Sequence, residues 1–235
     1  MVIRMGKIIV IEGTDCSGKE TQTRLLKEYL QNNGVSVGTM SYPQYHTPTG
    51  RIIGGPLLGK PAICETWFDD PMNLDSKVAS LLYAADRRAS LPELQNLIRT
   101  NDIVILDRYV YSNMAHQGSK IPDPEKREEL YHFLEELEFK LLELPKPDNV
   151  FFLYLPNEAA EQLRSHRPEV LDESEKNKQH QINSEAVFVE LAKLYHFQTI
   201  NCVDADGQVK SIEEIHREIV GETRKLVLPG LRFKK

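Results

Sequence analysis

The sequence has little of several features that define whole classes of protein. It holds three cysteines in 235 residues, Cys16, Cys64 and Cys202, at unrelated spacings. That pattern predicts neither a disulfide framework nor a zinc site, and it favours a cytoplasmic protein. The net charge of −6 lacks the basic excess that a nucleic-acid binder needs. No apolar run approaches membrane-spanning length, and no signal-peptide core precedes the first apolar run, so neither nucleic acid nor membrane is an expected partner.

The composition is that of an ordinary folded protein, with 40% hydrophobic and 27% charged residues. Apolar runs alternate with helical patterns along the whole chain, and no linker or repeat interrupts them. The predicted strands cover residues 8–11, 35–42, 102–107, 148–155 and 197–203. Because these runs are continuous rather than alternating, we expect a five-stranded parallel sheet with helices on both faces, in one domain over residues 1–235.

The helical patterns begin and end at recognisable signals. Ser90 and Pro92 divide a long helical segment, and Ser90 is expected to cap the second half. The segment 59–74 is predicted as a loop, without an assigned function. The first predicted helix follows Lys19. The others cover about 50–58, 75–100, 108–118, a stretch from Asp123 through an apolar stripe at 130–142, 157–166, a segment marked by apolar residues at 187–195, and 211–228.

One stretch near the start carries a phosphate-binding signature. The apolar run at 8–11 leads into Gly13, then Gly18 and Lys19, and a helix follows. Strand, glycine-bounded loop, Lys and helix is the pattern of a P-loop, whose backbone N–H groups cradle phosphates while the Lys reaches the β- and γ-phosphates. The predicted ATP-binding residues are Gly13, Thr14, Asp15, Cys16, Ser17, Gly18, Lys19, Glu20 and Thr21.

The loop departs from the usual pattern at the metal position. A Ser or Thr that ligates Mg²⁺ normally follows the Lys, whereas this chain has Glu20 there and Thr21 one position later. Either Glu20 holds Mg²⁺, directly or through water, or Thr21 takes over. Asp107, at the end of a predicted strand, is the second metal candidate, and its alternative role is an ion pair with Arg108 that caps the strand.

Two further places suggest nucleotide chemistry. Arg108 follows a strand end, and its planar guanidinium suits bidentate phosphate binding. Tyr83 and Arg87 lie one turn apart on a predicted helix, so they can stack on a base and hydrogen-bond its edge. Their alternative roles are an aromatic core residue and a surface charge.

Together these segments resemble the thymidylate kinase family over most of the chain. The resemblance rests on Glu12-Gly13-Thr14-Asp15 with Gly18-Lys19, on Tyr42-Pro43, on residues 82–87 (LYAADR) and on residues 107–115 (DRYVYSNMA). It implies a P-loop kinase fold and transfer of the γ-phosphoryl of ATP to dTMP, with Mg²⁺ and as a homodimer. The dTMP-binding residues that it implies are Asp15, Pro43, Tyr45, Tyr83, Arg87, Arg108, Ser112, Asn113, His116 and Gln117.

Two departures from the family pattern sharpen this expectation. His116 stands where many members have a Tyr against the deoxyribose, so it either blocks a 2′-hydroxyl or hydrogen-bonds to it. The P-loop contains no Arg, which one branch of the family uses in catalysis. The resemblance therefore implies a mobile lid at about 156–182 that supplies Arg164, Arg167 or both, which join Lys19 and Arg108 as predicted catalytic residues. The alternative role of the two arginines is a solvated helix end, where basic residues favour the helix dipole.

Two other functions are compatible with parts of this motif set, and a third is not. A kinase for another nucleotide, such as dUMP or UMP, would use the same residues. A P-loop ATPase without an acceptor would need only the loop. A GTPase would need an N-K-x-D motif, and the nearest match, at residues 177–180, lacks the Asp.

Overall fold

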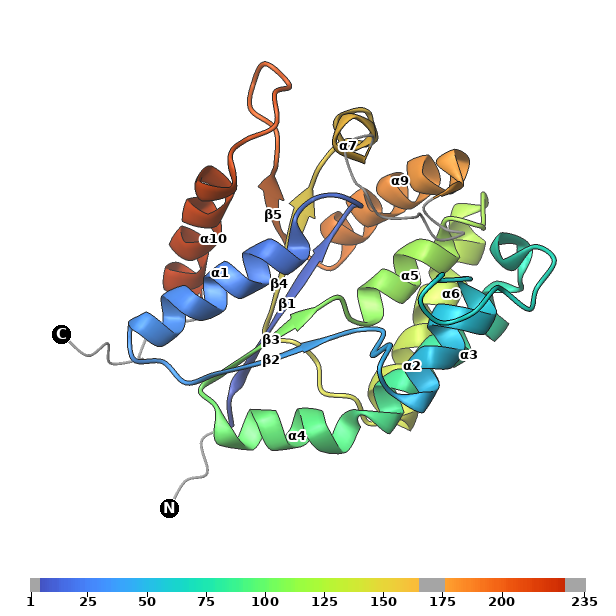
Figure 1. Cartoon of the computed structure of the whole chain (residues 1–235), viewed down its shortest axis with the longest axis horizontal. Helices are drawn as coiled ribbons and strands as arrows, with labels where there is room; N and C mark the ends of the chain where they lie inside the picture. Colours follow the sequence, from blue (N-terminus) through green and yellow to red (C-terminus); the bar gives the residue numbers. More distant parts are fainter. Residues whose placement is uncertain (1–4, 165–175, 227–235) are drawn as a thin grey trace.

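The computed structural model describes residues 5–164 and 176–226, and they form a parallel sheet with helices on both faces (Figure 1). The strands are β1 (Lys7–Gly13), β2 (Val37–Ser41), β3 (Ile103–Asp107), β4 (Asn149–Tyr154) and β5 (Gln198–Asn201). Their order is β2-β3-β1-β4-β5, and every adjacent pair is parallel. The predicted fold class is confirmed.

The apolar run in β1 is buried from both sides, as its continuous pattern predicts. Ile8 and Val10 belong to one core cluster, and Ile9 and Ile11 belong to the other, because successive side chains of a strand point to opposite faces. Helices α1 (Lys19–Asn32) and α10 (Ile212–Leu226) cover the second cluster. Full burial of each such Ile contributes roughly 1.5–3 kcal/mol.

The first cluster lies under helices on the opposite face of the sheet (Figure 1). These helices are α4 (Leu91–Thr100), α5 (Val110–Gly118), α6 (Pro124–Leu134) and α9 (Lys178–Leu194). The neighbouring strands β1 and β3 thus send the chain to opposite faces, β1 into α1 and β3 into α5. A crevice opens at the carboxyl ends of such a strand pair, and ligands of open α/β sheets bind there.

The remaining elements surround this end of the sheet. They are α2 (Pro48–Ile52), the π-helical turn η1 (Ile53–Leu57), the short 3₁₀ turn η2 (Pro71–Asn73), α3 (Ser76–Ala89), the π-helical segment η3 (Glu135–Leu141) and α7 (Asn157–Arg164). No helix in the described ranges is both long and apolar enough to cross a membrane.

Several local expectations need correction. The helical segment does restart at Ser90, but its hydroxyl donates to the carbonyl of Asp86 at 2.9 Å and makes no N-cap bond. The predicted loop at 59–74 contains the turn η2 near its end. In the apolar stripe of 130–142, Leu141 is 69% exposed, because the helix widens to a π-helix and rotates that position outward, whereas Leu142 still packs against the core.

Candidate active site

The P-loop is folded around its own lysine. Lys19 Nζ donates to the carbonyl oxygens of Gly13 (3.1 Å) and Thr14 (2.7 Å), so the ammonium lies inside the loop that would receive phosphates. Gly18 has φ +80°, a conformation that a side chain would strain. Burial, reinforced by the nearby Arg108 cation, lowers the pKa of Lys19 to about 8. The loop therefore presents a cation at the N-terminus of α1, as anion binding requires.

A buried ion pair connects the P-loop to the end of β3. Arg108 Nη2 lies 3.3 Å from Asp15 Oδ1, and both side chains are largely buried. Burial disfavours the Asp15 carboxylate, but Arg108 and Lys19 outweigh it and hold the pKa of Asp15 well below its usual range. Burial likewise opposes the Arg108 charge, and Asp15 and Asp107 raise the pKa of Arg108. Both groups are therefore ionised at neutral pH.

Arg108 is held in a backbone conformation that few side chains adopt. Its φ of +64° lies in the left-handed region, which costs about 1–2 kcal/mol for a residue with a Cβ. Its N–H donates to the carbonyl of Ile11 at 3.0 Å, so the neighbouring strand holds it in place. The turn aims the guanidinium toward Asp15 instead of along the strand.

Glu12 is a buried carboxylate that the sequence analysis did not place. Glu12 Oε1 accepts from the N–H groups of Tyr109 (2.8 Å) and Ser112 (3.0 Å), and Glu12 Oε2 accepts from Ser112 Oγ (2.5 Å). It thereby satisfies two of the orphan donors at the N-terminus of α5. Burial raises the pKa of Glu12. Its acidity inside an apolar strand was the signal that could have identified it.

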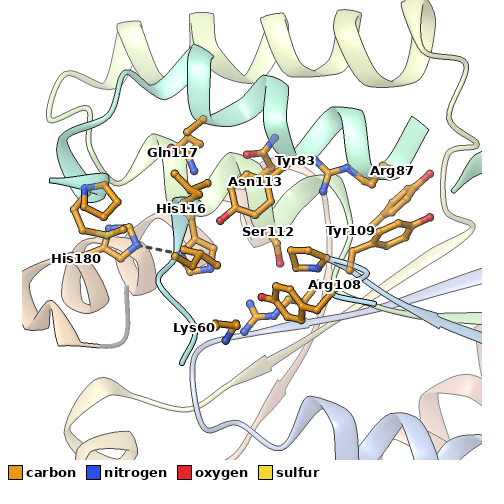
Figure 2. Close-up of a pocket in the computed structure, with 18 of the residues that line it drawn as sticks. Lys60, Tyr83, Arg87, Arg108, Tyr109, Ser112, Asn113, His116, Gln117 and His180 are labelled. Atoms are coloured by element: carbon orange, nitrogen blue, oxygen red, sulfur yellow. Dashed lines mark hydrogen bonds between the residues drawn. The ribbon is translucent and has the colours of Figure 1, made fainter. Parts of the chain in front are cut away.

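One cavity lies beside this cluster, with an empty volume of about 890 Å³ including its mouth. Every predicted dTMP-binding residue lines it, from helices α3 and α5 and from the segments that follow β1, β2 and β3; Figure 2 labels several of them. These residues are Asp15, Pro43, Tyr45, Tyr83, Arg87, Arg108, Ser112, Asn113, His116 and Gln117.

Arg87 is neither a surface charge nor a free guanidinium. Its Nε donates to Glu138 Oε2 and its Nη2 donates to Glu138 Oε1 at 2.6 Å, with 3% and 0% of the two side chains exposed. Asn113 Nδ2 also donates to Glu138 Oε1, at 3.2 Å. Burial opposes the charge, but Glu138 raises the pKa of Arg87. Glu138 follows Leu134 by one helical turn, so an acid on the apolar stripe was the missed signal.

His116 is part of a chain of hydrogen bonds that joins α5 to α9. His116 Nδ1 lies 3.2 Å from His180 Nε2 (Figure 2), and His180 Nδ1 lies 3.2 Å from Ser119 Oγ. Ser119 Oγ donates its single proton to the carbonyl of His116 at 2.8 Å, so it accepts from His180 Nδ1. His180 Nε2 then accepts from His116 Nδ1, which leaves His116 Nε2 as a hydrogen-bond acceptor. Burial and His180 lower the pKa of His116 to about 3.

A second hollow lies on the other side of Arg108 and Tyr45, and it contains both metal candidates. Glu20 and Asp107 line it together with Thr23, Arg24 and other residues. Asp107 Oδ1 is buried and has no hydrogen-bond partner among the described residues. An unpaired buried carboxylate oxygen is unusual without a cation. The two carboxylates offer the hard oxygen ligands that Mg²⁺ prefers, so the residues present fit such an ion.

The predicted lid lies partly outside the described residues. Its first part is helix α7, and its last residues begin α9; Arg167 and the side chain of Arg164 are not described. A small hollow beside Thr14 and Asp15 is lined by Asn157 and Ala160 of α7 and by Gln181 of α9. The described parts of the lid segment thus flank the P-loop. The catalytic role of the two arginines stays a prediction.

Fold and site together define a P-loop nucleotide kinase, because a phosphate loop at the end of β1 adjoins a separate cavity for a second substrate. Comparison with known proteins names the family. The model of the thymidylate kinase family matches residues 11–219, and the chain belongs to that family, as its motifs predicted.

Individual relatives match most of the chain. The chain is 27% identical to the thymidylate kinase of Plasmodium falciparum, over 98% of this chain and 95% of that protein. It is 30% identical to the thymidylate kinase of Mycobacterium tuberculosis, over 79% and 85%. Its structure is similar to that of the Candida albicans thymidylate kinase, a protein described as having broad substrate specificity, with a TM-score of 0.70, 25% identity and coverage of 94% and 92%.

Proposed function

We propose that this protein transfers the γ-phosphoryl group of ATP to dTMP, giving dTDP, with ATP on the P-loop and dTMP in the adjoining cavity. Membership of the thymidylate kinase family supports this reaction. The observation that carries the residue assignments is the convergence of all the predicted dTMP-binding residues on one cavity beside Lys19 and Asp15. No observation favours a nucleotide kinase for another acceptor or an ATPase.

The phosphates are bound by cations on either side of the reacting atoms. Lys19 binds the β- and γ-phosphates of ATP after exchanging the loop carbonyls for phosphate oxygens. Arg108 binds the phosphate of dTMP, and Asp15 orients the Arg108 guanidinium from the P-loop side. Because the attacking phosphate oxygen is already an anion at neutral pH, no strong general base is needed, and catalysis consists of positioning and charge neutralisation.

The base and sugar of dTMP occupy the rest of the cavity. Tyr83 stacks on the base. Nε and Nη2 of Arg87 donate to Glu138. Nη1 has no hydrogen bond among the described residues, so it can donate to the base edge. Glu138 is therefore a positioning residue that fixes the plane of the Arg87 guanidinium. Ser112, whose hydroxyl is held by Glu12, contributes its backbone and Cβ to the wall instead of a hydrogen bond to the base.

Asp107 and Glu20 are the proposed holders of Mg²⁺, on the side of the P-loop away from the base. When bound, the ion neutralises charge on the β- and γ-phosphates. The unpaired Asp107 Oδ1 supports this assignment. Glu20 is exposed at the start of α1 and its charge also favours the helix N-terminus.

Three further assignments complete the proposal. The lid arginines Arg164 and Arg167 stabilise the transferring phosphoryl. A homodimer forms through α3 and its neighbours, where Val78 and Leu81 are 47% and 50% exposed. The cytoplasm is the working compartment, in keeping with free thiols at all three cysteines, which lie in the described part of the chain.

The test is ADP release with dTMP, dUMP and UMP as acceptors, for the wild-type protein and for Arg108→Gly. Glycine adopts φ +64° without strain, so this variant removes the guanidinium and keeps the turn. We expect dTMP to be the preferred acceptor and Arg108→Gly to lower kcat/KM for dTMP by about 10²–10³-fold. Arg99→Ala, at an exposed position of α4, is the control.

Near-normal turnover of Arg108→Gly would overturn the role of Arg108. A clear preference for dUMP or UMP would replace dTMP as the substrate. Hydrolysis without acceptor that is as fast as transfer would support the ATPase instead.

A further inference from the structure

The segment 59–74, which the sequence left without a function, packs directly against the acceptor cavity. Phe68 and Leu74 contact the buried cluster of Ile53, Leu57 and Leu58, which also touches Tyr83. Three residues of the segment line the cavity itself, namely Lys60, Pro71 and Met72. The segment is therefore part of the wall of the acceptor site.

Hydrogen bonds hold the start of this segment on the π-helical turn η1. The N–H of Lys60 donates to the carbonyl of Gly54 at 2.7 Å, and the N–H of Trp67 donates to that of Pro56 at 2.9 Å. A Cβ on Gly54 would lie 2.4 Å from Ile63 Cδ1 and 2.8 Å from the ring of Tyr45, so both side chains pack closely on this glycine. The backbone that carries Lys60 is thus fixed relative to Tyr45.

Lys60 stands at the passage between the acceptor cavity and the hollow that holds the metal candidates. Five residues line both spaces, Tyr42, Pro43, Tyr45, Lys60 and Arg108. Lys60 Nζ lies 5.0 Å from the centre of the Tyr45 ring, and Figure 2 shows Lys60 and Arg108 on the same side of the cavity. Among these shared residues, Lys60 and Arg108 are the two cations. The acceptor phosphate must lie at this passage to reach the donor.

The charge balance at the passage calls for a second cation. A nucleoside monophosphate carries about −1.5 to −2 at pH 7. The Arg108 charge is offset by Asp15 at 3.3 Å, with Asp107 and Glu12 also close enough to raise the pKa of Arg108. Lys19 is bound by the P-loop carbonyls and faces the donor. A phosphate dianion bound by Arg108 alone would therefore enter surroundings without net positive charge.

We propose that Lys60 is a second cation for the acceptor phosphate, a positioning residue that binds its oxygens from the side opposite to Asp15. This inference rests on the proposed acceptor site. The Lys60 ammonium lies over the face of the Tyr45 ring in a cation–π contact. A phosphate oxygen can take the place of the ring as its partner without a large movement of the Lys60 side chain. The segment 59–74 then has two roles, because it carries the Lys60 charge and forms part of the cavity wall.

The test compares the affinities of dTMP and thymidine, which differ only by the phosphate, by calorimetry on the full-length protein. In Lys60→Met the affinity for dTMP should fall about 10- to 100-fold, the range for a charge-assisted hydrogen bond, while that for thymidine changes less than about threefold. Lys60→Arg should retain most of the dTMP affinity. At saturating dTMP, kcat of Lys60→Met should stay within about threefold of wild type, so that the loss appears in KM.

The control is Lys140→Met, a lysine that is 72% exposed and paired with Glu136 on η3. It should leave both affinities unchanged. Equal weakening of dTMP and thymidine in Lys60→Met would show a merely structural role and overturn the proposal, as would no change in either. A wild-type protein that binds dTMP no more tightly than thymidine would overturn the proposed acceptor site together with it.

Discussion

The pair of Arg87 and Glu138 offers the sharpest test of how this site is held together. Glu138→Gln preserves the shape of the side chain and removes its charge. Arg87, only 3% exposed, then keeps its charge without a counter-ion. Asn113 loses the charged acceptor of one of its hydrogen bonds. Because both side chains are buried, solvent cannot replace the lost interaction.

The expected loss is large for a conservative change. Removing one partner of a buried ion pair typically costs about 3–5 kcal/mol. In a protein of this size each kcal/mol lowers the Tm by roughly 2–4 °C, so we expect a fall of roughly 6–20 °C. The double variant Arg87→Met/Glu138→Leu removes both charges and fills the space, and we expect it to be more stable than Glu138→Gln.

The assay is thermal and urea unfolding of these variants, with KM for dTMP measured on each. Glu28→Gln is the matched control, because it makes the same chemical change in the exposed pair Arg24–Glu28 and should cost less than about 1 kcal/mol. KM for dTMP should rise in Glu138→Gln, since the Arg87 guanidinium loses its fixed plane. A loss of stability no larger than in the control would refute the reasoning, and so would an unchanged KM.

Two further predictions concern protonation in the site. The pKa of Lys19, lowered to about 8, means that its charge is present below that pH and lost above it, so kcat/KM for ATP should fall about tenfold per unit above pH 8. In Lys19→Arg that alkaline limb should be absent, and its persistence would assign it to another group. His116 Nε2 is an acceptor that can receive a sugar hydroxyl, so His116→Phe should lower kcat/KM for UMP by about 2- to 12-fold relative to dUMP, which lacks only the 2′-hydroxyl. An equal effect on both acceptors would contradict this tautomer.

Local sequence patterns were enough to predict the P-loop and the end of β3. The apolar run of β1 followed by Gly13, Gly18 and Lys19 predicted strand, loop and helix, because each is governed by residues within a few positions. The same holds for Asp107 and Arg108 at the end of β3. Since parallel strands bring their carboxyl ends to one edge, the sequence also predicted that these residues meet.

Partners distant in the chain were beyond such reasoning. Arg87 and Glu138 are 51 residues apart, and His116 and His180 are 64 apart. No helical or strand period connects them, and a buried charge finds its counter-ion only when the helices that carry both have packed. From the sequence alone, Arg87 could either hydrogen-bond the base edge or be a surface charge. The structure shows that its side chain is buried and paired with Glu138.

By itself, the sequence determined the fold class and the phosphate loop, since these follow from local hydrogen bonding, glycine geometry and apolar periodicity. Its motifs indicated the family, and the resemblance to that family predicted the residues that line the acceptor cavity. Only the tertiary structure decided how those residues are held. Glu12 accepts hydrogen bonds from the N-terminus of α5, Glu138 pairs with Arg87, and His180 hydrogen-bonds to His116. Lys60 reaches the passage from a segment that carries no motif. The physical reason is that ion pairs and hydrogen bonds act over a few ångströms in space, and packing alone brings these groups within that range.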